Sequence, residues 1–303
     1  MTVLERCWDA TRPVDVLRTL APLRRGTGDP AHRVDADGAF WWAAATPCGD
    51  GTMTLRGKGC VVSARAWGQG GAWLLEQLPV LLGASDDWSS LQLAAFPALH
   101  EVQRRRPGVR LPATGLVLDS LVPAVLEQRV TGGDAHRAWR LLLQRFGRQA
   151  PGPLDVLRVP PSARALLDLA TWDWHRLGVD ARRQRAIRAA ATVAGRLEEC
   201  TAMAPREALA RLRVVPGVGE WTAAETSQRA FGHPDAVSVG DYHLADLVVH
   251  YFTGRPRGTD DEMLHLLTPW AGQRQRVVRL VELSGVAKPR FGPRLAPADI
   301  RAI

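Results

Sequence analysis

The chain has 303 residues, of which 46% are hydrophobic and 23% charged, a composition ordinary for a globular protein with two or three domains. It contains no run of about 18 apolar residues, which excludes a membrane-spanning helix. Lys and Arg outnumber Asp and Glu by 39 to 31, and the resulting net charge of +8 favours binding to polyanions. Nearly all of these cations are arginines, whose planar guanidinium binds phosphate at two points. A GC-rich genome that favours arginine codons accounts for the same excess, so the charge is supporting evidence only.

The amino terminus and the cysteines indicate the cellular compartment. The first residues include acids and lack the apolar core of a signal peptide, so we expect a cytoplasmic, bacterial protein. Cys7, Cys48, Cys60 and Cys200 form no Cys-x-x-Cys pair and are expected to be reduced. The eight histidines show no metal-binding spacing, so a catalytic metal is not expected.

Residues 1–106 are expected to form a mixed α/β domain. A short helix is predicted over residues 14–23 and an apolar helix over 72–82. Between them lie three predicted strands separated by Pro- and Gly-containing turns, at residues 40–45, 52–56 and 59–67. Strands followed by a helix predict a small antiparallel sheet with helices on one face.

Residues 107–284 are expected to form an all-α domain, so the fold class is α+β. A Pro- and Gly-rich linker over residues 106–112 precedes it. The predicted helices span residues 116–129, 134–146, 154–157, 164–167, 182–199, 205–212, 220–231, 242–252, 260–267 and 272–283. Residues 285–303, rich in Pro and Arg, are expected to be a poorly ordered tail. We expect five tryptophans to be packing residues: Trp41, Trp42, Trp172, Trp174 and Trp270.

The most informative segment begins with a tight turn, Pro216-Gly217-Val218-Gly219. Proline fixes φ, and glycine permits positive φ and close backbone approach. Helix-forming residues on both sides predict a helix, a hairpin and a second helix. We expect the N–H groups of Val218, Gly219 and the next helix's first turn to lack internal partners. At the positive end of the helix dipole, such groups suit a phosphate.

An aspartate, Asp241, follows in a Val-Gly-Asp-Tyr segment twenty residues after Trp221. In isolation, an aspartate before a helix is most simply an N-cap. Asp235 and Asp246 are the neighbouring alternatives, the first in a loop and the second one turn into the helix.

Hairpin and aspartate at this spacing resemble the helix-hairpin-helix DNA glycosylases, in particular the 3-methyladenine DNA glycosylase II type. The turn alone also occurs in polymerases, ligases and recombination proteins. The resemblance covers nearly the whole chain and is densest over residues 107–284. It implies a small sheet domain before a helix-hairpin-helix core. It also implies a base-excision-repair enzyme whose partner is duplex DNA. The oligomeric state is left open by the sequence, and a monomer is expected.

By this resemblance Asp241 is the catalytic residue. Hydrolysis of an N-glycosidic bond passes through an oxocarbenium-like transition state, which a carboxylate stabilises while it orients or deprotonates water. In the lyase branch of the superfamily, a lysine occupies the position of Trp221 and forms a Schiff base with the sugar. An indole is no nucleophile, so we expect a glycosylase without lyase activity. The resemblance also places the Trp221 ring against the flipped base.

Glu225 departs from the family pattern. One helical turn beyond Trp221, the family has an aromatic residue, and its C-terminal helix adds a tryptophan that residues 272–283 lack. The substrate pocket, assigned to Trp221, Glu225, Gln128 and Tyr242, is therefore expected to be less aromatic and more acidic. Pairing with Arg279 or a neighbouring arginine, contact with a base edge, and exposure to solvent all remain open for Glu225.

Alkylated purines are the expected substrates, because their positive charge weakens the glycosidic bond. Two alternatives remain: a glycosylase for deaminated or oxidised bases, and a catalytically inactive protein that only binds lesions.

The resemblance also implies how DNA is held. In residues 126–131, Arg129 is the expected wedge that fills the gap left by a flipped nucleotide. The expected DNA-binding residues are Arg129, Pro216, Gly217, Val218, Gly219 and Thr222. A sodium or potassium ion at the carbonyls of Arg213, Val215 and Gly217 is implied as a structural ion. No other cofactor is expected, because the iron–sulfur cluster of some relatives needs four closely spaced cysteines after the catalytic domain.

Overall fold

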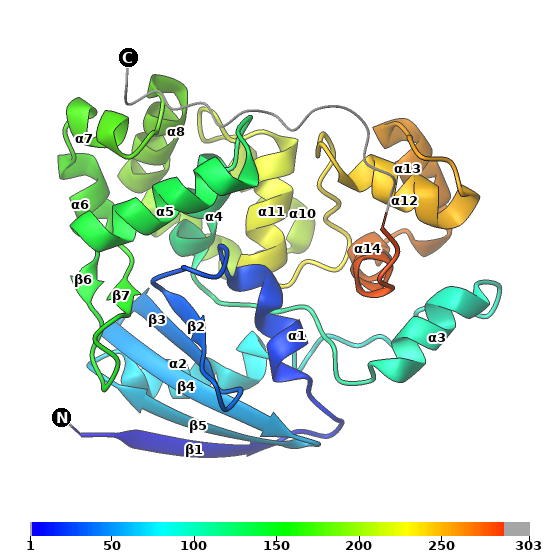
Figure 1. Cartoon of the computed structure of the whole chain (residues 1–303), viewed down its shortest axis with the longest axis horizontal. Helices are drawn as coiled ribbons and strands as arrows, with labels where there is room; N and C mark the ends of the chain where they lie inside the picture. Colours follow the sequence, from blue (N-terminus) through cyan, green and yellow to red (C-terminus); the bar gives the residue numbers. More distant parts are fainter. Residues whose placement is uncertain (1, 288–303) are drawn as a thin grey trace.

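A computed structural model describes residues 2–287, and its fold class is α+β as predicted (Figure 1). A five-stranded antiparallel sheet has the order β1-β5-β4-β3-β2. Its strands are β1 (Leu4–Asp9), β2 (His32–Val34), β3 (Phe40–Thr46), β4 (Gly49–Lys58) and β5 (Val61–Trp67). The three predicted strands are confirmed, although β4 is longer because it includes residues assigned to turns. β1 and β2 were not predicted.

Strand β3 is buried on both faces of the sheet. Phe40 and Trp42 join a cluster with the leucines of α2 (Gly71–Leu81), whereas Trp41 and Ala43 join a cluster on the other face. Burial on both faces explains why the sequence of β3 is apolar without alternation. The second cluster includes Val159 of a two-stranded ribbon, β6 (Arg148–Gln149) and β7 (Arg158–Val159).

Most of the remaining chain is helical. The helices are α1 (Val16–Leu20), α3 (Pro97–Arg105), α4 (Val117–Leu126), α5 (Gly132–Phe146), α6 (Ala163–Asp168), α7 (Thr171–Arg176), α8 (Ala181–Thr192), α9 (Ala194–Glu198), α10 (Pro205–Arg213), α11 (Glu220–Ala230), α12 (Leu244–Thr253), α13 (Asp260–Leu266) and α14 (Arg274–Leu283), with 3-10 turns η1 (Ala21–Leu23), η2 (Glu199–Ala202) and η3 (Thr268–Trp270). The helix predicted at 154–157 is wrong, because that segment is the loop between β6 and β7. The helix predicted at 182–199 is divided at Val193, whose φ of −111° and ψ of 19° are not helical. Helices α3 and α7 were not predicted.

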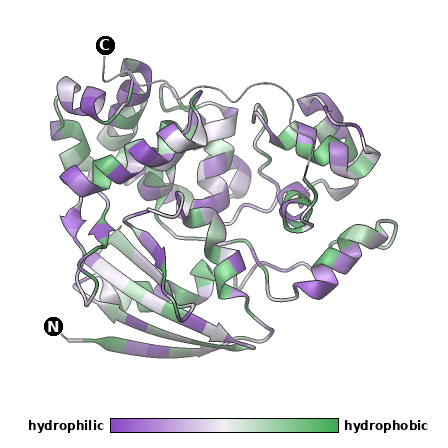
Figure 2. Ribbon diagram, viewed as in Figure 1, coloured by the Kyte–Doolittle hydropathy of each residue, from purple (hydrophilic) through white to green (hydrophobic). Residues whose placement is uncertain are grey.

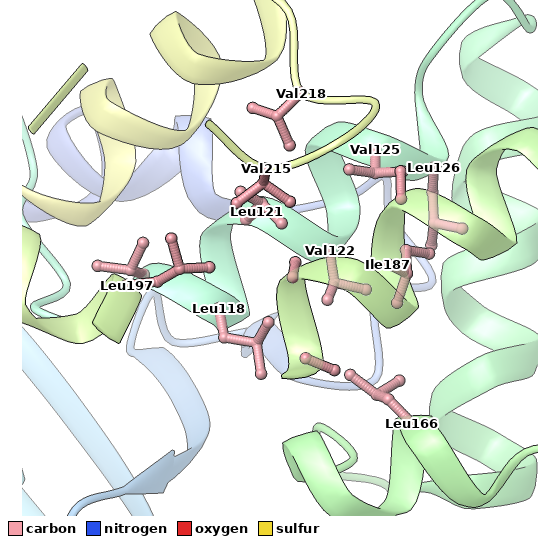
Figure 3. Packing of buried hydrophobic residues seen from close by; sticks show 14 of the residues in the cluster. Leu118, Leu121, Val122, Val125, Leu126, Leu166, Ile187, Leu197, Val215 and Val218 are labelled. Carbon is pink, nitrogen blue, oxygen red and sulfur yellow. The ribbon is translucent and has the colours of Figure 1, made fainter. Parts of the chain in front are cut away.

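The helices form two apolar cores. One joins α4, α5, α8, α10 and α11, and Figure 3 shows its buried side chains around Leu121 and Val122 of α4. The other joins α12, α13 and α14 with Trp88, Leu99 and Leu111. Figure 1 shows α12–α14 beside α11, with the segment after α11 crossing between them. Figure 2 shows mixed hydrophilic and hydrophobic residues along the outer helices, as expected for elements with one face in a core.

The boundaries at 106 and 284 remain predictions, and α3 packs with the C-terminal helices rather than with the sheet. From residue 288 onward the predicted tail lies outside the described residues. No helix in the described part of the chain has the length and apolar character needed to cross a membrane.

The tryptophans show where composition alone misleads. Trp41, Trp42, Trp174 and Trp270 are buried, as predicted. The prediction for Trp172 is wrong, since this residue is 66% exposed on α7. The first turn of this short helix holds Trp174 in the core and leaves Trp172, two residues earlier, on the opposite side.

Candidate active site

The hairpin between α10 and α11 is built around a glycine. Gly217 has φ of +88°, and a Cβ at this position would lie 2.7 Å from the Cβ of Ala186 on α8. Val215 and Val218 on either side are buried in the core, and Figure 3 shows Val215 next to Leu121. The turn therefore sits directly against the helical core, in a conformation that favours glycine.

One expectation about the hairpin amides needs correction. The Val218 N–H donates to the Val215 carbonyl at 3.0 Å and is therefore already satisfied within the turn. No side chain caps α11, whose N-cap residue is Gly219 with open space around its Cα. The first-turn amides of α11 thus remain the groups suited to an anion.

Gln128 ties the end of α4 to the hairpin. Its Nε2 donates to the Gly217 carbonyl at 2.9 Å and to Thr222 Oγ1 at 2.8 Å. Thr222 is buried, and its hydroxyl is already used as the acceptor for Gln128. Of the carbonyls implied for a cation, those of Val215 and Gly217 already accept hydrogen bonds, and the ion stays a prediction.

Arg129 follows Gln128 with φ of +55° and is the one non-glycine residue with positive φ among residues 2–287. Its side chain is exposed. This conformation costs an arginine free energy that a glycine would not lose, and such strain clusters at functional positions. The expected wedge therefore lies beside the hairpin in an exposed, strained conformation.

Asp241 lies at the start of α12. Its Oδ1 accepts from the N–H groups of His243 and Leu244 at 2.8 and 2.9 Å, and its Oδ2 accepts from Trp221 Nε1 at 3.0 Å. The carboxylate is thus fixed at the positive end of α12 and joined to the helix that follows the hairpin. It is partly exposed, which leaves it accessible to a reacting group.

The alternative aspartates are engaged elsewhere. Asp235 forms a 2.6 Å ion pair with Arg274, which lowers the pKa of Asp235 although burial opposes this. Asp246 accepts from the Gly258 N–H at 3.0 Å. Among the three aspartates of this segment, Asp241 is the one that meets Trp221.

Glu225 pairs with a neighbouring arginine and does not face solvent. Its Oε2 lies 2.7 Å from Arg229 Nη1, and its Oε1 accepts from Ser238 Oγ at 2.5 Å. Its side chain is 13% exposed. Arg279, the other partner considered, pairs with Glu282 at 2.8 Å.

A cavity of about 360 Å³ lies where α11, α14, η1 and the linker meet. It is lined by Ala21, Pro22, Leu111, Pro112, Glu225, Gln228, Arg229, Gln275, Arg279 and Glu282. Of the four residues predicted to form the pocket, Glu225 lines this cavity. Trp221 instead contacts Asp241, Gln128 contacts the hairpin, and Tyr242 is 80% exposed with its ring against His243.

Sequence reasoning missed Gln228, Gln275 and Glu282 as lining residues, and it considered Arg279 and a neighbouring arginine only as possible partners of Glu225. Their spacing carried a signal, because Glu225, Gln228 and Arg229 share one face of α11, and Gln275, Arg279 and Glu282 share one face of α14. Tertiary packing decides that these faces of α11 and α14 meet, and residue spacing within each helix does not predict it.

Comparisons with known proteins show what the sequence and the fold resemble. No family model matches the chain. A curated protein of Mycobacterium tuberculosis, named "Probable bifunctional transcriptional activator/DNA repair enzyme AlkA", is 33% identical over 155 residues, or 50% of this chain. That match spans 31% of the curated relative's length.

Two solved structures share the fold. A 3-methyladenine DNA glycosylase from Archaeoglobus fulgidus superimposes with a TM-score of 0.77 at 16% identity, covering 92% of this chain and 98% of the other. A DNA-bound 8-oxoguanine glycosylase/lyase from Clostridium acetobutylicum does so with a TM-score of 0.71 at 9% identity, covering 93% and 97%. The chain therefore has the fold of these DNA glycosylases. At these identities the solved structures establish the fold of the chain and leave its chemistry to its own residues.

Proposed function

We propose that the chain is a DNA glycosylase that hydrolyses the N-glycosidic bond of damaged bases in duplex DNA, with alkylated purines as its first substrates. The observation that carries this proposal is the 3.0 Å hydrogen bond from Trp221 Nε1 to Asp241, which joins the helix after the hairpin to a partly exposed carboxylate. As the first enzyme of base excision repair, it would act in the cytoplasm of a bacterial cell. The AlkA relative, named as a DNA repair enzyme, supports the same activity.

In this mechanism Asp241 stabilises positive charge that develops on the sugar as the base departs. Its carboxylate also orients the attacking water or accepts the proton of that water. The N–H groups of His243 and Leu244 hold one carboxylate oxygen, and Trp221 holds the other, so little reorganisation is needed during the reaction.

The same geometry supports hydrolysis without lyase chemistry. A lyase needs an amine that attacks the sugar carbon, and Trp221 stands where the lyase branch has its lysine. The indole N–H is a hydrogen-bond donor only and already faces Asp241.

For DNA binding, we propose that the first-turn amides of α11, including that of Thr222, bind a phosphate next to the lesion. Pro216, Gly217, Val218 and Gly219 would bring the backbone close to the DNA, with the implied monovalent ion behind them. Arg129 would fill the space of the flipped nucleotide, and Gln128 would support the hairpin from α4. One copy of the chain supplies every residue of this arrangement, in keeping with a monomer.

The test is base release from duplex DNA treated with a methylating agent, with products separated by chromatography. We expect free methylated purines, and abasic strands that break only after alkali. Failure to release any base while DNA is still bound would overturn the proposal in favour of a lesion-binding protein. Strand breakage without alkali would overturn the hydrolytic mechanism.

A further inference from the structure

The cavity lined by Glu225 is polar for a base-binding site. Its volume of about 360 Å³ lies within the range of small-molecule sites, roughly 300–1,000 Å³. Two glutamates, two arginines and two glutamines line it, together with small apolar residues of η1 and the linker. No aromatic ring is among these lining residues, so stacking alone does not explain what the cavity would bind.

The cavity and Asp241 lie along the same face of α11. Trp221, which bonds Asp241, is one helical turn before Glu225, which lines the cavity. The loop before α12 follows this face, because Ser238 bonds Glu225 while its carbonyl accepts from the Asp241 N–H at 3.2 Å. A base held in the cavity would therefore be attached to a sugar near Asp241.

The cavity has hydrogen-bond acceptor sites that are still free. A carboxylate has about four acceptor sites, and the contacts of Glu225 with Ser238 and Arg229 occupy one on each oxygen. Gln275 is 6% exposed, and its buried Oε1 has no hydrogen-bond partner among the described residues. A buried acceptor without a partner is costly unless a ligand supplies a donor.

Each cationic side chain of the cavity is held by a carboxylate and by a backbone carbonyl. Arg229 binds Glu225 and donates to the Pro22 carbonyl at 2.9 Å. Arg279 binds Glu282 and donates to the Arg18 carbonyl at 2.8 Å. The two arginines hold the carboxylates of Glu225 and Glu282 in place. The free acceptor sites of the cavity therefore suit a ligand with hydrogen-bond donors.

We propose, on the basis of the glycosylase function, that Glu225 and Gln275 bind the donor-rich edge of a guanine-type base. Guanine presents N1–H and N2–H groups side by side, a pair of donors that a carboxylate accepts. Adenine presents an unprotonated N1 at the same place, which a carboxylate repels. Both methylated bases carry positive charge, so this edge rather than charge distinguishes them. The enzyme selects damaged guanines, such as N7-methylguanine, over N3-methyladenine.

The experiment uses one methylated duplex, which contains both N7-methylguanine and N3-methyladenine. The release rate of each base is divided by its spontaneous release from the same DNA. Sites that hydrogen-bond a substrate edge reject analogues without it, so we expect N7-methylguanine to be favoured roughly tenfold or more. Glu225→Gln replaces an acceptor with a donor and should bring the ratio close to one. Gln275→Met leaves the ion pair of Glu225 in place and should also lower the ratio.

A matched control is Glu101→Gln. Glu101 pairs with an arginine four residues later, as Glu225 does, but on the exposed surface of α3. This variant should keep the wild-type ratio. Thermal unfolding identifies any variant that fails to fold, in which case the other carries the test. Equal release of the two bases by the wild type, faster release of N3-methyladenine, or a ratio that neither variant moves would overturn the guanine preference alone. Absence of any release would overturn the glycosylase function itself.

Discussion

At the scale of single residues, Trp221 is the residue that we propose joins substrate binding to catalysis. Its ring was expected to contact the base, and its N–H donates to Asp241 at 3.0 Å. An indole therefore does two things that a lysine at this position would not: it fixes a carboxylate without competing for a proton, and it excludes a Schiff base. The contact makes Trp221 a positioning residue for Asp241.

Removal of this hydrogen bond should slow base release. Trp221→Phe keeps an aromatic ring but loses the N–H, and hydrogen bonds to charged groups contribute about 1.5–3 kcal/mol. If this free energy is lost in the transition state, single-turnover base release should be about 10- to 100-fold slower. DNA affinity, measured by anisotropy, serves as the control. An unchanged release rate would show that the contact plays no part in catalysis.

We expect the conformation of Arg129 to lower the stability of the fold, while its side chain strengthens DNA binding. With φ of +55°, this residue is strained, and Arg129→Gly should raise the free energy of unfolding by about 1 kcal/mol. The same change removes the wedge and should weaken binding to damaged duplex DNA. Arg129→Ala keeps the strain, so it should weaken binding without the gain in stability. Urea denaturation and anisotropy of all three proteins test both effects, and equal stability of the Gly and Ala variants would contradict the account.

The residues that sequence could and could not predict differ in physical kind. Asp241 and Glu225 were found in the short segment that begins at the hairpin, and Glu225 does pair with an arginine one turn later on the same helix. Gln275 and Arg279 reach the cavity from α14, about fifty residues away, and nothing local indicates that approach. The hydrogen bond from the Val218 N–H to the Val215 carbonyl was also not predicted. It depends on the exact dihedral angles of the turn, which the Pro-Gly pattern does not fix.

At the scale of elements, the hairpin depends on the close approach of Gly217 to α8. Gly217→Ala combines positive φ with a Cβ 2.7 Å from that of Ala186. We expect a loss of about 1–3 kcal/mol of stability and weaker DNA binding. Gly219→Ala is the matched control, because its φ is −89° and a Cβ there meets nothing within 4 Å. A similar loss of stability for both variants would contradict the role assigned to the turn.

Long periodic elements were predictable, whereas short or edge elements were not. α4, α5 and α11 carry apolar residues at helical spacing, and β5 alternates along its length. β1 has a weak apolar pattern because it lies at the edge of the sheet, and pairing with β5 fixes it. α3 is polar on most of its surface and is held by Leu99, its buried residue, against the C-terminal core.

At the scale of the whole molecule, a half-buried acid, Asp119, marks the junction of the sheet and the helical core. Burial raises the pKa of Asp119 on α4 to about 7, with a further contribution from Glu198. Glu198 accepts from the Val117 and Leu118 N–H groups at 2.7 and 2.9 Å and so holds the start of α4. Burial also raises the pKa of Glu198.

The contribution of Asp119 to the stability of the fold should therefore fall as pH rises. The native state retains a proton on Asp119 between its ordinary pKa of 3.8 and about 7, whereas the unfolded state releases it. The stability that protonated Asp119 contributes is complete below about pH 4 and is lost by about pH 7. The free energy of unfolding falls by about 4 kcal/mol over this range. Asp119→Asn should remove that loss, so its advantage over the wild type in urea denaturation should be larger at pH 8 than at pH 5. An equal difference at both pH values would contradict the prediction.

The catalytic role of Asp241 is tested most directly by single-turnover release of methylated purines, wild type beside Asp241→Asn. Asparagine keeps the size of the side chain and an oxygen that can still cap α12, but it removes the negative charge. Because acid–base and electrostatic contributions of one group reach about 100-fold or more, we expect at least that loss in rate without loss of DNA affinity. Release by the Asn variant at the wild-type rate would contradict the assignment of Asp241 as the catalytic residue.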